Sequence, residues 1–591
     1  MNNSNQLINP FDNNYFIGYV SYVSPNFSKI HFPSSVLLKQ FNFAGEEMNA
    51  GLIGNYVAIE GDNYGFLGKI IEIALPEKER LELNEKSFKS SEFHPTGKVE
   101  ILLAFNFLTR KIKRGLGQFP SVGAKVYICS SSVISSFFEE YGRKSESDQI
   151  YFDLATLSFD QKTNIRVSPQ SLFGRHCAIV GTTGGGKSYT LAKLLEETIK
   201  HKGKAILIDA TGEFENVSLG NSADADNLTF NLDTFFHYSY LKTTDLFVLF
   251  RPSEQIQLPK LQEAIKTLKL IHIISKKDGA LRTAEETTFL SYANPTYGFL
   301  DKSGKQRNIF ISVIKSNPES EYLDGNFDIN ILAYQIHYEC VWNTDQNKPD
   351  HYGGINERDL GMCQSLITRI FFITKTNYFK NIFGLDQNKD DPNEFTFRLN
   401  QFLQSEKNLF RISLSDVPFE SNVREILVNS IGNVLLDRAR KKQFISDGNQ
   451  PVLVFIDEAH QFLNKRIKGE FSFDVELGAF DQIAKECRKY GLFLILATQM
   501  PRDIPHGTLS QVGTFIVHRL INHLDKEAIE NACSASNQYS LSFLPSLGEG
   551  EALLMGVDFP MPVILKMDMP RIEPKYNTPT IFKIKSPSPT I

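Results

Sequence analysis

The first part of the chain alternates short apolar runs with turn residues. Between residue 15 and about 135 these runs are YFIGYVSYVS, NYVAIEG, FLGKIIEIAL, VEILLAFNFL and KVYICS. Their spacing is typical of short strands that close into a small all-β barrel. Residues 136 to about 170 become more polar and include EEYGRKSESDQ. We therefore expect a linker region after the barrel.

From His176 the pattern changes to apolar strands that alternate with amphipathic segments, which predicts an α/β fold with a parallel sheet. The expected strands are CAIV (177–180), AILID (205–209), LFVLF (246–250), FRISLSD (410–416), VLVFID (452–457), LFLILATQ (492–499) and TFIVHRL (514–520), with EALLMG and PVILKM completing the sheet.

Between about residues 256 and 404 the sequence no longer shows the apolar runs typical of strands. LQEAIKTLKLIHIISKK, ILAYQIHYECVW and LGMCQSLITRIFFITKT have the period of amphipathic helices, so we expect a helical insertion. The expected organisation is a barrel and linker (1–150), the first part of the α/β core (151–255), the insertion (256–404), the second part of the core (405–575) and a tail (576–591). The proline-containing tail is either disordered or a strap that crosses a neighbour.

Composition limits the function classes. The chain has 591 residues, 41% of them hydrophobic and 22% charged, which is the profile of a soluble protein with several structural units. The net charge of −5 predicts no general affinity for nucleic acid, so a site for it must be local. Six cysteines without C-x-x-C pairs indicate reduced core thiols. There is no signal-peptide pattern and no apolar run of membrane-spanning length, so we expect a cytoplasmic protein.

The stretch GTTGGGKS matches the P-loop pattern G-x-x-x-x-G-K-[ST], with an apolar strand before it and a helical pattern after it. Glycines let backbone N–H groups turn towards a phosphate, Lys187 would reach the β- and γ-phosphates, and Ser188 would ligate Mg²⁺. The alternative, a glycine-rich turn without a ligand, conflicts with the agreement of strand, loop and helix. The candidate nucleotide-binding residues are Gly181, Thr182, Thr183, Gly184, Gly185, Gly186, Lys187, Ser188 and Tyr189.

The stretch VLVFIDEAH supplies acidic residues at the end of a second apolar strand. Asp457 is placed to hold the Mg²⁺ shell, and Glu458 to polarise the attacking water. The alternative is an ordinary acidic strand end, which the P-loop upstream makes less favourable. NKDD (388–391) formally matches a guanine-specificity pattern, but it lies in a polar stretch, so ATP is favoured over GTP.

Three further stretches resemble the HerA branch of the HerA/FtsK motor ATPases: LIDATGEF (207–214), ECRKYGLFLILATQMPRDIP (486–505) and GRHCAIVGTTGGGKS (174–188). The resemblance extends over roughly residues 10 to 575. It implies a RecA-like P-loop ATPase core behind a HAS-like barrel, in a hexameric ring. ATP and Mg²⁺ would lie at the subunit interfaces, and double-stranded DNA would pass through the pore.

The resemblance also implies roles for single residues. Lys187, Ser188, Asp457 and Glu458 match the catalytic blocks, and Gln499 would sense the γ-phosphate, unless it only caps its strand. Arg488 would reach a neighbour's nucleotide, with a surface charge as the alternative, and Arg175 would serve the same site. Asp209 and Glu213 match the motif after the second strand, with either a functional or a capping role. The chain departs from the family at Ala210–Thr211 and at Met500, where Pro-His and a basic residue are common.

The basic stretch NKRIKG (464–469), with Lys465, Arg466 and Lys468, is the best candidate for a DNA-contacting pore loop, and a solvated loop is its alternative. DRARKKQ (437–443) is also basic, but cations at a helix end suit the helix dipole.

Together these features favour an ATP-driven double-stranded DNA translocase or helicase. The resemblance further implies a role in anti-phage defence with a separate nuclease or sirtuin-type NADase, which we expect to be bound through the barrel. One alternative is an ATP-controlled ring scaffold that assembles and activates a toxic effector. Another is an archaeal-type end-resection motor that works with the nuclease NurA. The sequence leaves open the partner's chemistry, six or seven subunits, the direction of movement and the trigger.

Overall fold

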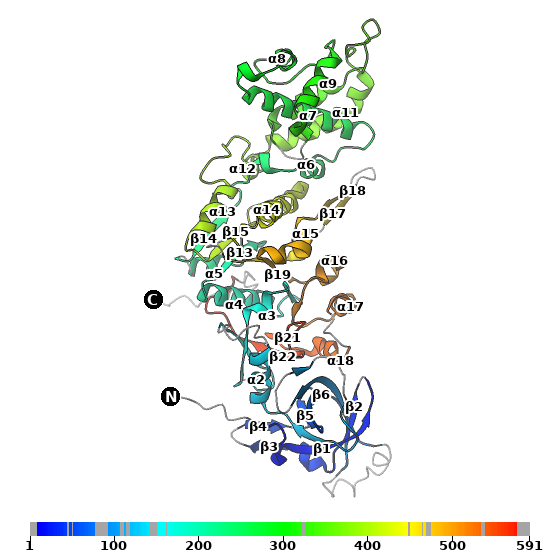
Figure 1. Cartoon of the computed structure of the whole chain (residues 1–591), viewed down its shortest axis with the longest axis vertical. Coiled ribbons are helices and arrows are strands. Elements are labelled where there is room, and N and C mark those ends of the chain that lie inside the picture. Colours follow the sequence, from blue (N-terminus) through cyan, green and yellow to red (C-terminus); the bar gives the residue numbers. More distant parts are fainter. Residues whose placement is uncertain are drawn as a thin grey trace, which may run out of the picture. The chain divides into compact units, whose positions relative to one another are not determined.

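The computed structural model describes residues 9–575 except 26, 44–45, 50, 77–92, 107–111, 114–118, 142–149, 161, 221–222, 322–325, 447–449, 464, 469–473 and 534–537. The chain divides into two compact units. The first contains residues 1–201 and 493–573, and the second contains residues 202–492 and 574–591. Each unit is described by itself below, with the element labels of Figure 1.

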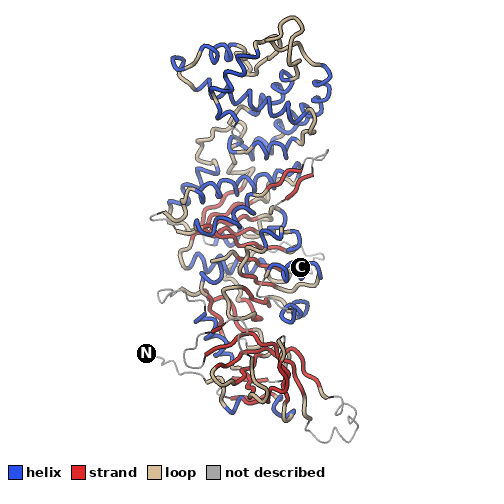
Figure 2. Tube along the Cα trace, turned by 45° about the vertical axis from the view of Figure 1, so that its right-hand side comes forward, coloured by secondary structure: helices blue, strands red, loops and turns tan. Residues whose placement is uncertain are grey.

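The first unit begins with a closed antiparallel barrel, as the sequence predicts. Its strands follow the order β2 (Ser28–His31), β1 (Phe16–Val23), β9 (Lys125–Ile128), β5 (Tyr56–Glu60), β6 (Tyr64–Ala74) and β7 (Thr96–Asn106), and β2 pairs with β7 to close the ring. Figure 2 shows these strands curling around one another. Alternate side chains such as Ile17, Ile30, Val57 and Ile70 fill the interior. β2 and the hairpin of β3 (Gln40–Phe43) and β4 (Glu46–Asn49) were not predicted, because at least half of the residues in each of these strands are polar.

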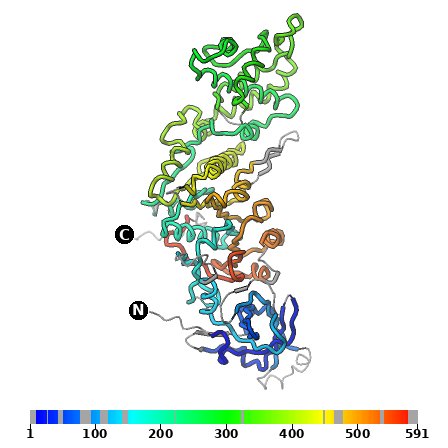
Figure 3. Tube along the Cα trace, in the orientation of Figure 1, coloured from blue at the N-terminus to red at the C-terminus, as the bar shows by residue number. Residues whose placement is uncertain are grey.

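The rest of the first unit is built on a mixed sheet. Its strand order is β11 (Asn164–Val167), β10 (Phe152–Leu157), β22 (Val563–Met567), β21 (Glu551–Gly556), β20 (Thr514–Val517), β12 (Cys177–Val180) and β19 (Leu492–Thr498). β12 is parallel to both β19 and β20, whereas the pairings from β20 to β11 are antiparallel. Figure 3 shows the late strands running beside much earlier parts of the chain. The helices are α2 (Ser131–Tyr141), α3 (Pro169–Phe173), α4 (Lys187–Lys200), α16 (His506–Leu509), α17 (His523–Ala532) and α18 (Gln538–Ser542).

The expected linker between 136 and 170 is wrong for the described residues of this range. α2 extends to Tyr141, and β10 and β11 add two strands to the sheet beyond β22. Polar residues flank these short strands, which masks their apolar alternation. The strand that pairs with β10, β22, lies some 400 residues later in the chain.

The second unit contains a parallel sheet with the order β16 (Val452–Ile456), β13 (Lys204–Asp209), β15 (Leu409–Ser413) and β14 (Ala225–Thr229). Around it lie α5 (Glu215–Gly220), α6 (Thr243–Phe250), α14 (Val423–Arg440) and α15 (Ala479–Glu486), with a hairpin of β17 (Lys465–Lys468) and β18 (Asp474–Leu477). The order of strands and helices confirms the predicted α/β core.

The expected strand LFVLF is instead the second half of α6. The Asp245 carboxylate accepts the Lys242 N–H (2.9 Å), which caps the amino end of this helix. The same carboxylate accepts hydrogen bonds from Asn429 and Ser430 of α14, and burial raises the pKa of Asp245 to about 6. Nearly every side chain of α6 is buried, so a short apolar run carries no period that distinguishes helix from strand.

The helical insertion is confirmed. Its helices are α7 (Gln257–Lys276), α8 (Ala284–Ser291), α9 (Arg307–Ser316), α10 (Leu332–Glu339), α11 (Glu357–Lys375), α12 (Asn377–Phe383) and α13 (Phe395–Gln404). Leu270, Ile274, Phe289 and Phe310 form one of its apolar clusters. Within the described ranges, no helix has the length and apolar character needed to cross a membrane.

Candidate ATPase site

The P-loop of the first unit connects β12 to α4, where the sequence predicts it. Gly184 (φ 74°) and Gly186 (φ 109°) adopt left-handed backbone conformations that side chains rarely permit. The ends of two neighbouring strands hold the loop in place. The Gly181 N–H donates to the Thr498 carbonyl (3.3 Å), and the Thr182 N–H donates to the Arg519 carbonyl (3.1 Å).

The loop offers unused hydrogen-bond donors at the amino end of a helix. In the described part of the chain, the N–H groups of Gly184 and Gly186 have no acceptor, whereas Gly185 N–H bonds to the Thr182 carbonyl (3.1 Å). Lys187 begins α4 and is only 6% exposed. Free N–H groups, a helix amino end and a lysine together suit a phosphate group. This arrangement fits ATP, the ligand expected from the sequence.

His518, which the sequence analysis did not identify, lies directly beneath the P-loop. It follows β20, and its N–H donates to the Val180 carbonyl (2.7 Å). A Cβ atom added at Gly181 would lie 2.6 Å from the His518 Cβ, and one added at Gly186 would lie 3.2 Å from its Cε1. The His518 side chain therefore leaves no room for a side chain at Gly181 and little room for one at Gly186. No sequence pattern marks His518, because it stands beside the loop only through the pairing of β12 with β20.

Hydrogen bonds fix the protonation of His518. Its Nδ1 lies 2.9 Å from the Glu551 carbonyl oxygen, which can only accept, so Nδ1 carries the proton. Its Nε2 therefore accepts from the Thr190 hydroxyl at 2.9 Å. Burial, together with the nearby charge of Lys187, lowers the pKa of His518 to about 4. The imidazole is neutral at physiological pH.

Gln499 lies against the P-loop, as the sequence predicts. It directly follows β19, the parallel neighbour of β12, and its Oε1 accepts the Thr183 hydroxyl (2.6 Å). The neighbouring Tyr189 is partly buried in α4, and its hydroxyl donates to Glu573 (3.3 Å). The Gln499 amide therefore lies at a strand tip beside the loop.

Arg175 precedes β12, so the full length of this strand separates it from the P-loop, roughly 13 Å for four residues. Its guanidinium forms an ion pair with Asp558 (3.2 Å), and its stem packs on Gly513, where an added Cβ would approach to 2.3 Å. Within its own chain Arg175 therefore lies away from the loop that would hold the phosphates.

The acidic candidates belong to the second unit. Asp457 follows β16, is 4% exposed, and its N–H donates to the Ile208 carbonyl (3.1 Å). Glu458 has a left-handed backbone (φ 47°), which is uncommon for a residue with a side chain. Its carboxylate lies 3.3 Å from Nδ1 of His460.

Asp209 has a structural role in the second unit. Its carboxylate accepts the N–H groups of Gly212 (2.8 Å) and Phe214 (3.2 Å), and it forms a buried ion pair with Arg411 (2.7 Å). These bonds hold the loop that carries Glu213. The sequence left open a functional or a capping role for Asp209, and the structure supports the capping role. Arg411 was missed, because the sequence gives no sign that β15 pairs with β13.

Arg488 lies in the short turn after α15 and is exposed. Its side chain has no hydrogen-bond or ion-pair partner in the described part of the chain, so it is available to a second molecule. The basic stretch 465–468 is β17, paired with β18 from Lys465↔Leu477 to Lys468↔Asp474. The expected loop is thus a β-hairpin, and Asn464 and Gly469 of that stretch lie outside the described residues.

Comparisons with known proteins identify the family. Residues 152–438 match the family model described as the central domain of helicase HerA, and residues 443–570 match the HerA-like C-terminal domain. A probable helicase of Methanocaldococcus jannaschii is 24% identical over 572 residues, covering 94% of this chain and 91% of the relative. The DNA double-strand break repair helicase HerA of Saccharolobus solfataricus is 22% identical, covering 88% of each chain.

Among solved structures, VirB4 of Thermoanaerobacter pseudethanolicus is similar with a TM-score of 0.42 and 13% identity, covering 72% of this chain and 97% of that chain. The plasmid coupling protein TrwB in complex with an ATP analogue gives a TM-score of 0.40 and 12% identity, covering 76% of this chain and 95% of that chain. Together the two HerA family models cover most of the chain, and the P-loop lies within the first of them. The chain therefore belongs to the HerA helicase family, as an ATP-hydrolysing member.

Proposed function

We propose that this chain is an ATP-driven translocase or helicase of double-stranded DNA that works as a hexameric ring. The observation that carries the proposal is the P-loop, whose unused N–H groups and Lys187 form a phosphate cradle inside a HerA domain. Several relatives are named DNA double-strand break repair helicases, which supports DNA as the polymer on which the motor acts.

The roles of the site residues follow from their chemistry. Lys187 and the loop N–H groups bind and orient the phosphates, and Gln499 contacts the terminal phosphate. Glu458 polarises the attacking water by accepting its proton. Ser188 and Asp457 supply the oxygen ligands that suit Mg²⁺, and the bound cation would neutralise charge that develops on the phosphates.

A ring explains the position of the arginines. Arg488 is exposed and has no partner in the described part of its own chain, and Arg175 lies at the far end of β12 from its own P-loop. We propose that Arg488 completes the site of a neighbouring subunit, where a guanidinium stabilises charge on the γ-phosphate, and that Arg175 supports the same interface.

For DNA contact we propose the β17–β18 hairpin, which carries Lys465, Arg466 and Lys468 on one strand. Contacts between such residues and backbone phosphates are independent of base sequence and weaken with salt. The net charge of −5 makes a local, basic element of this kind necessary.

We further propose that a separate effector, a nuclease or a sirtuin-type NADase, binds the amino-terminal barrel and that the pair serves in anti-phage defence. The barrel exposes several apolar side chains that suit a protein contact: Tyr19, Tyr22, Leu52, Ile53 and Val122.

Steady-state ATP turnover, measured with and without linear double-stranded DNA, tests the proposal, with Lys187→Ala as the inactive control. Stimulation by DNA is expected of a translocase. Turnover that ignores DNA and appears only with a co-purified partner would instead identify an ATP-controlled scaffold for an effector.

A further inference from the structure

The second unit contains a polar cavity of about 630 Å³ that the ATPase reaction does not use. It lies at the amino ends of three neighbouring parallel strands, where Lys204 begins β13, Asn408 precedes β15 and Gln450 precedes β16. Asp209 ends β13 and Asp457 follows β16, both at the opposite, carboxyl ends of these strands. The cavity is therefore separate from the acidic end of the sheet, and its size is that of a small-molecule site.

One buried side chain in this cavity lacks a partner. Asn408 is 3% exposed, and its Oδ1 has no hydrogen-bond partner in the described part of the chain. Its backbone is hydrogen-bonded: the N–H donates to the Asp224 carbonyl (2.8 Å), and the carbonyl accepts the Ala205 N–H (2.8 Å). A buried amide oxygen left without a donor is costly, so its presence in a cavity wall indicates that a ligand supplies the donor.

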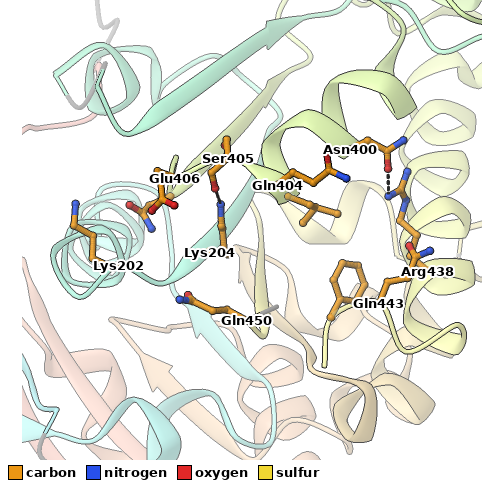
Figure 4. A pocket seen from close by; sticks show the side chains of 12 residues that line it. Lys202, Lys204, Asn400, Gln404, Ser405, Glu406, Arg438, Gln443 and Gln450 are labelled. Carbon is orange, nitrogen blue, oxygen red and sulfur yellow. Dashed lines mark hydrogen bonds between the residues drawn. The ribbon is translucent and has the colours of Figure 1, made fainter. Parts of the chain in front are cut away.

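A guanidinium at one end of the cavity has spare donors. Arg438 donates to Asn400 Oδ1 (2.6 Å) and weakly to the Thr396 carbonyl (3.5 Å), and it forms no ion pair with the described residues. It is half-buried, and the loss of water around it lowers its pKa. An arginine without a carboxylate partner suits a phosphate, which it can bind through two parallel hydrogen bonds. Figure 4 shows Arg438 beside Asn400 at the right of the view, with Lys202 at the far left.

Lys204 has a different role. Its ammonium group donates to the carbonyls of Phe402 (3.1 Å), Ser405 (2.5 Å) and Lys407 (2.6 Å), so its three protons are used to hold the end of α13 in place. Lys204 shapes the wall and adds positive charge. The remaining polar lining consists mainly of amides, with Gln404, Gln443 and Gln450 beside the edge of Phe444, and a single carboxylate, Glu406.

We infer that this cavity is a second nucleotide site, one that takes a mononucleotide without hydrolysing it. Arg438 binds the phosphate. The Asn408 amide, an acceptor beside a donor, pairs with the edge of an adenine base, which offers an amino group beside a ring nitrogen. The proposed general base, Glu458, follows the opposite end of β16. The ligand is therefore bound and released unchanged, and it acts as a regulator of the motor.

Calorimetric titration of the full chain with AMP tests this, in a Lys187→Ala background that removes phosphate binding by the P-loop. We expect one AMP to bind per chain. Gln443→Glu places a negative charge in the lining at an exposed position that does not endanger folding, and it should weaken AMP binding about tenfold. Gln482→Glu adds the same charge on α15, outside the cavity, and should leave the affinity unchanged.

Asn408→Leu should weaken AMP but not inorganic phosphate, whereas Arg438→Met should weaken both. Adenosine and phosphate, titrated alone, separate the two halves of the ligand. Absence of binding at millimolar AMP would overturn the inference. So would equal binding of AMP and phosphate, or an affinity that Gln443→Glu and Asn408→Leu leave unchanged. Because binding is measured without turnover, this outcome is independent of the proposed motor function.

Discussion

The imidazole of His518 accepts a hydrogen bond from the hydroxyl of Thr190, with Nε2 and Oγ1 2.9 Å apart. Thr190 lies in the first turn of α4, and His518 follows β20, so this bond ties the helix after the P-loop to the strand beside it. Both side chains are fully buried. The loop glycines pack on the same imidazole, and His518 is therefore a positioning residue for the phosphate cradle.

Removing this bond should weaken both the fold and nucleotide binding. Thr190→Val keeps the side-chain shape but leaves the His518 Nε2 acceptor buried without a donor, which costs about 1–3 kcal/mol of stability. We expect a lower melting temperature and a higher KM for ATP. Thr198→Val is the matched control, because among the described residues the Thr198 hydroxyl bonds only to the Leu194 carbonyl of its own helix. Equal KM values in the two variants would contradict the positioning role.

The lowered pKa of His518 also predicts that the folding stability depends on pH. Its pKa is about 4 in the folded chain, against an ordinary value of 6.5, so between these values the unfolded state binds more protons. Stability from this group is complete above pH 6.5 and is lost as pH falls towards 4, by about 3 kcal/mol in total. Thermal unfolding from pH 7.5 to 4.5 should show a smaller acid-side decrease in His518→Gln than in the unaltered chain. Parallel curves for the two proteins would exclude this contribution.

Glu458→Gln should preserve ATP binding and abolish hydrolysis. The amide is nearly the same size as the carboxylate but cannot accept the proton of water, so turnover should fall about 10²-fold or more. Nucleotide titration measures binding, and phosphate release measures turnover. Glu420→Gln, at an exposed position outside the site, is the control and should keep full activity. Normal hydrolysis by Glu458→Gln would show that another group activates the water.

Arg488→Ala should leave ATP binding by each chain intact and stop hydrolysis in the proposed ring, because we propose that the guanidinium acts on a neighbour's nucleotide. Mixing Arg488→Ala with Lys187→Ala chains should restore part of the turnover, since some interfaces then combine an intact P-loop with an intact arginine. Lys489→Ala is the adjacent control, and it should have full activity. No recovery in the mixture would place the function of Arg488 within its own chain.

Arg411→Met should destabilise the second unit strongly. It leaves the buried Asp209 carboxylate without its cationic partner, and breaking such a pair costs about 3–5 kcal/mol. Arg440→Met breaks the exposed pair with Glu486 and should cost no more than about 1 kcal/mol. Denaturant unfolding compares the two variants, and similar losses would show that the Asp209 pair contributes little.

Local sequence was sufficient where the chemistry is contiguous. The P-loop needs eight consecutive residues with glycines at fixed places, and the structure forms it between β12 and α4 as predicted. The barrel strands other than β2 and the insertion helices α7, α10 and α11 were likewise predicted, because strand and helix periods are local features of the sequence. The run LFVLF was predicted wrongly. Its side chains are buried on all sides, so its apolar residues show neither a helix nor a strand period, and the capping bond to Asp245 stabilises the helix.

The sequence by itself determined the α/β class, the barrel, the insertion and the phosphate cradle, because each depends on residues near one another in the chain. Only the tertiary structure placed His518 beneath that cradle, Arg411 against Asp209, and Asn408 in the wall of a cavity. These relationships arise from strands that pair across hundreds of residues, such as β12 with β20 and β13 with β15. No local pattern encodes such pairing, since it is decided by the packing of the whole sheet.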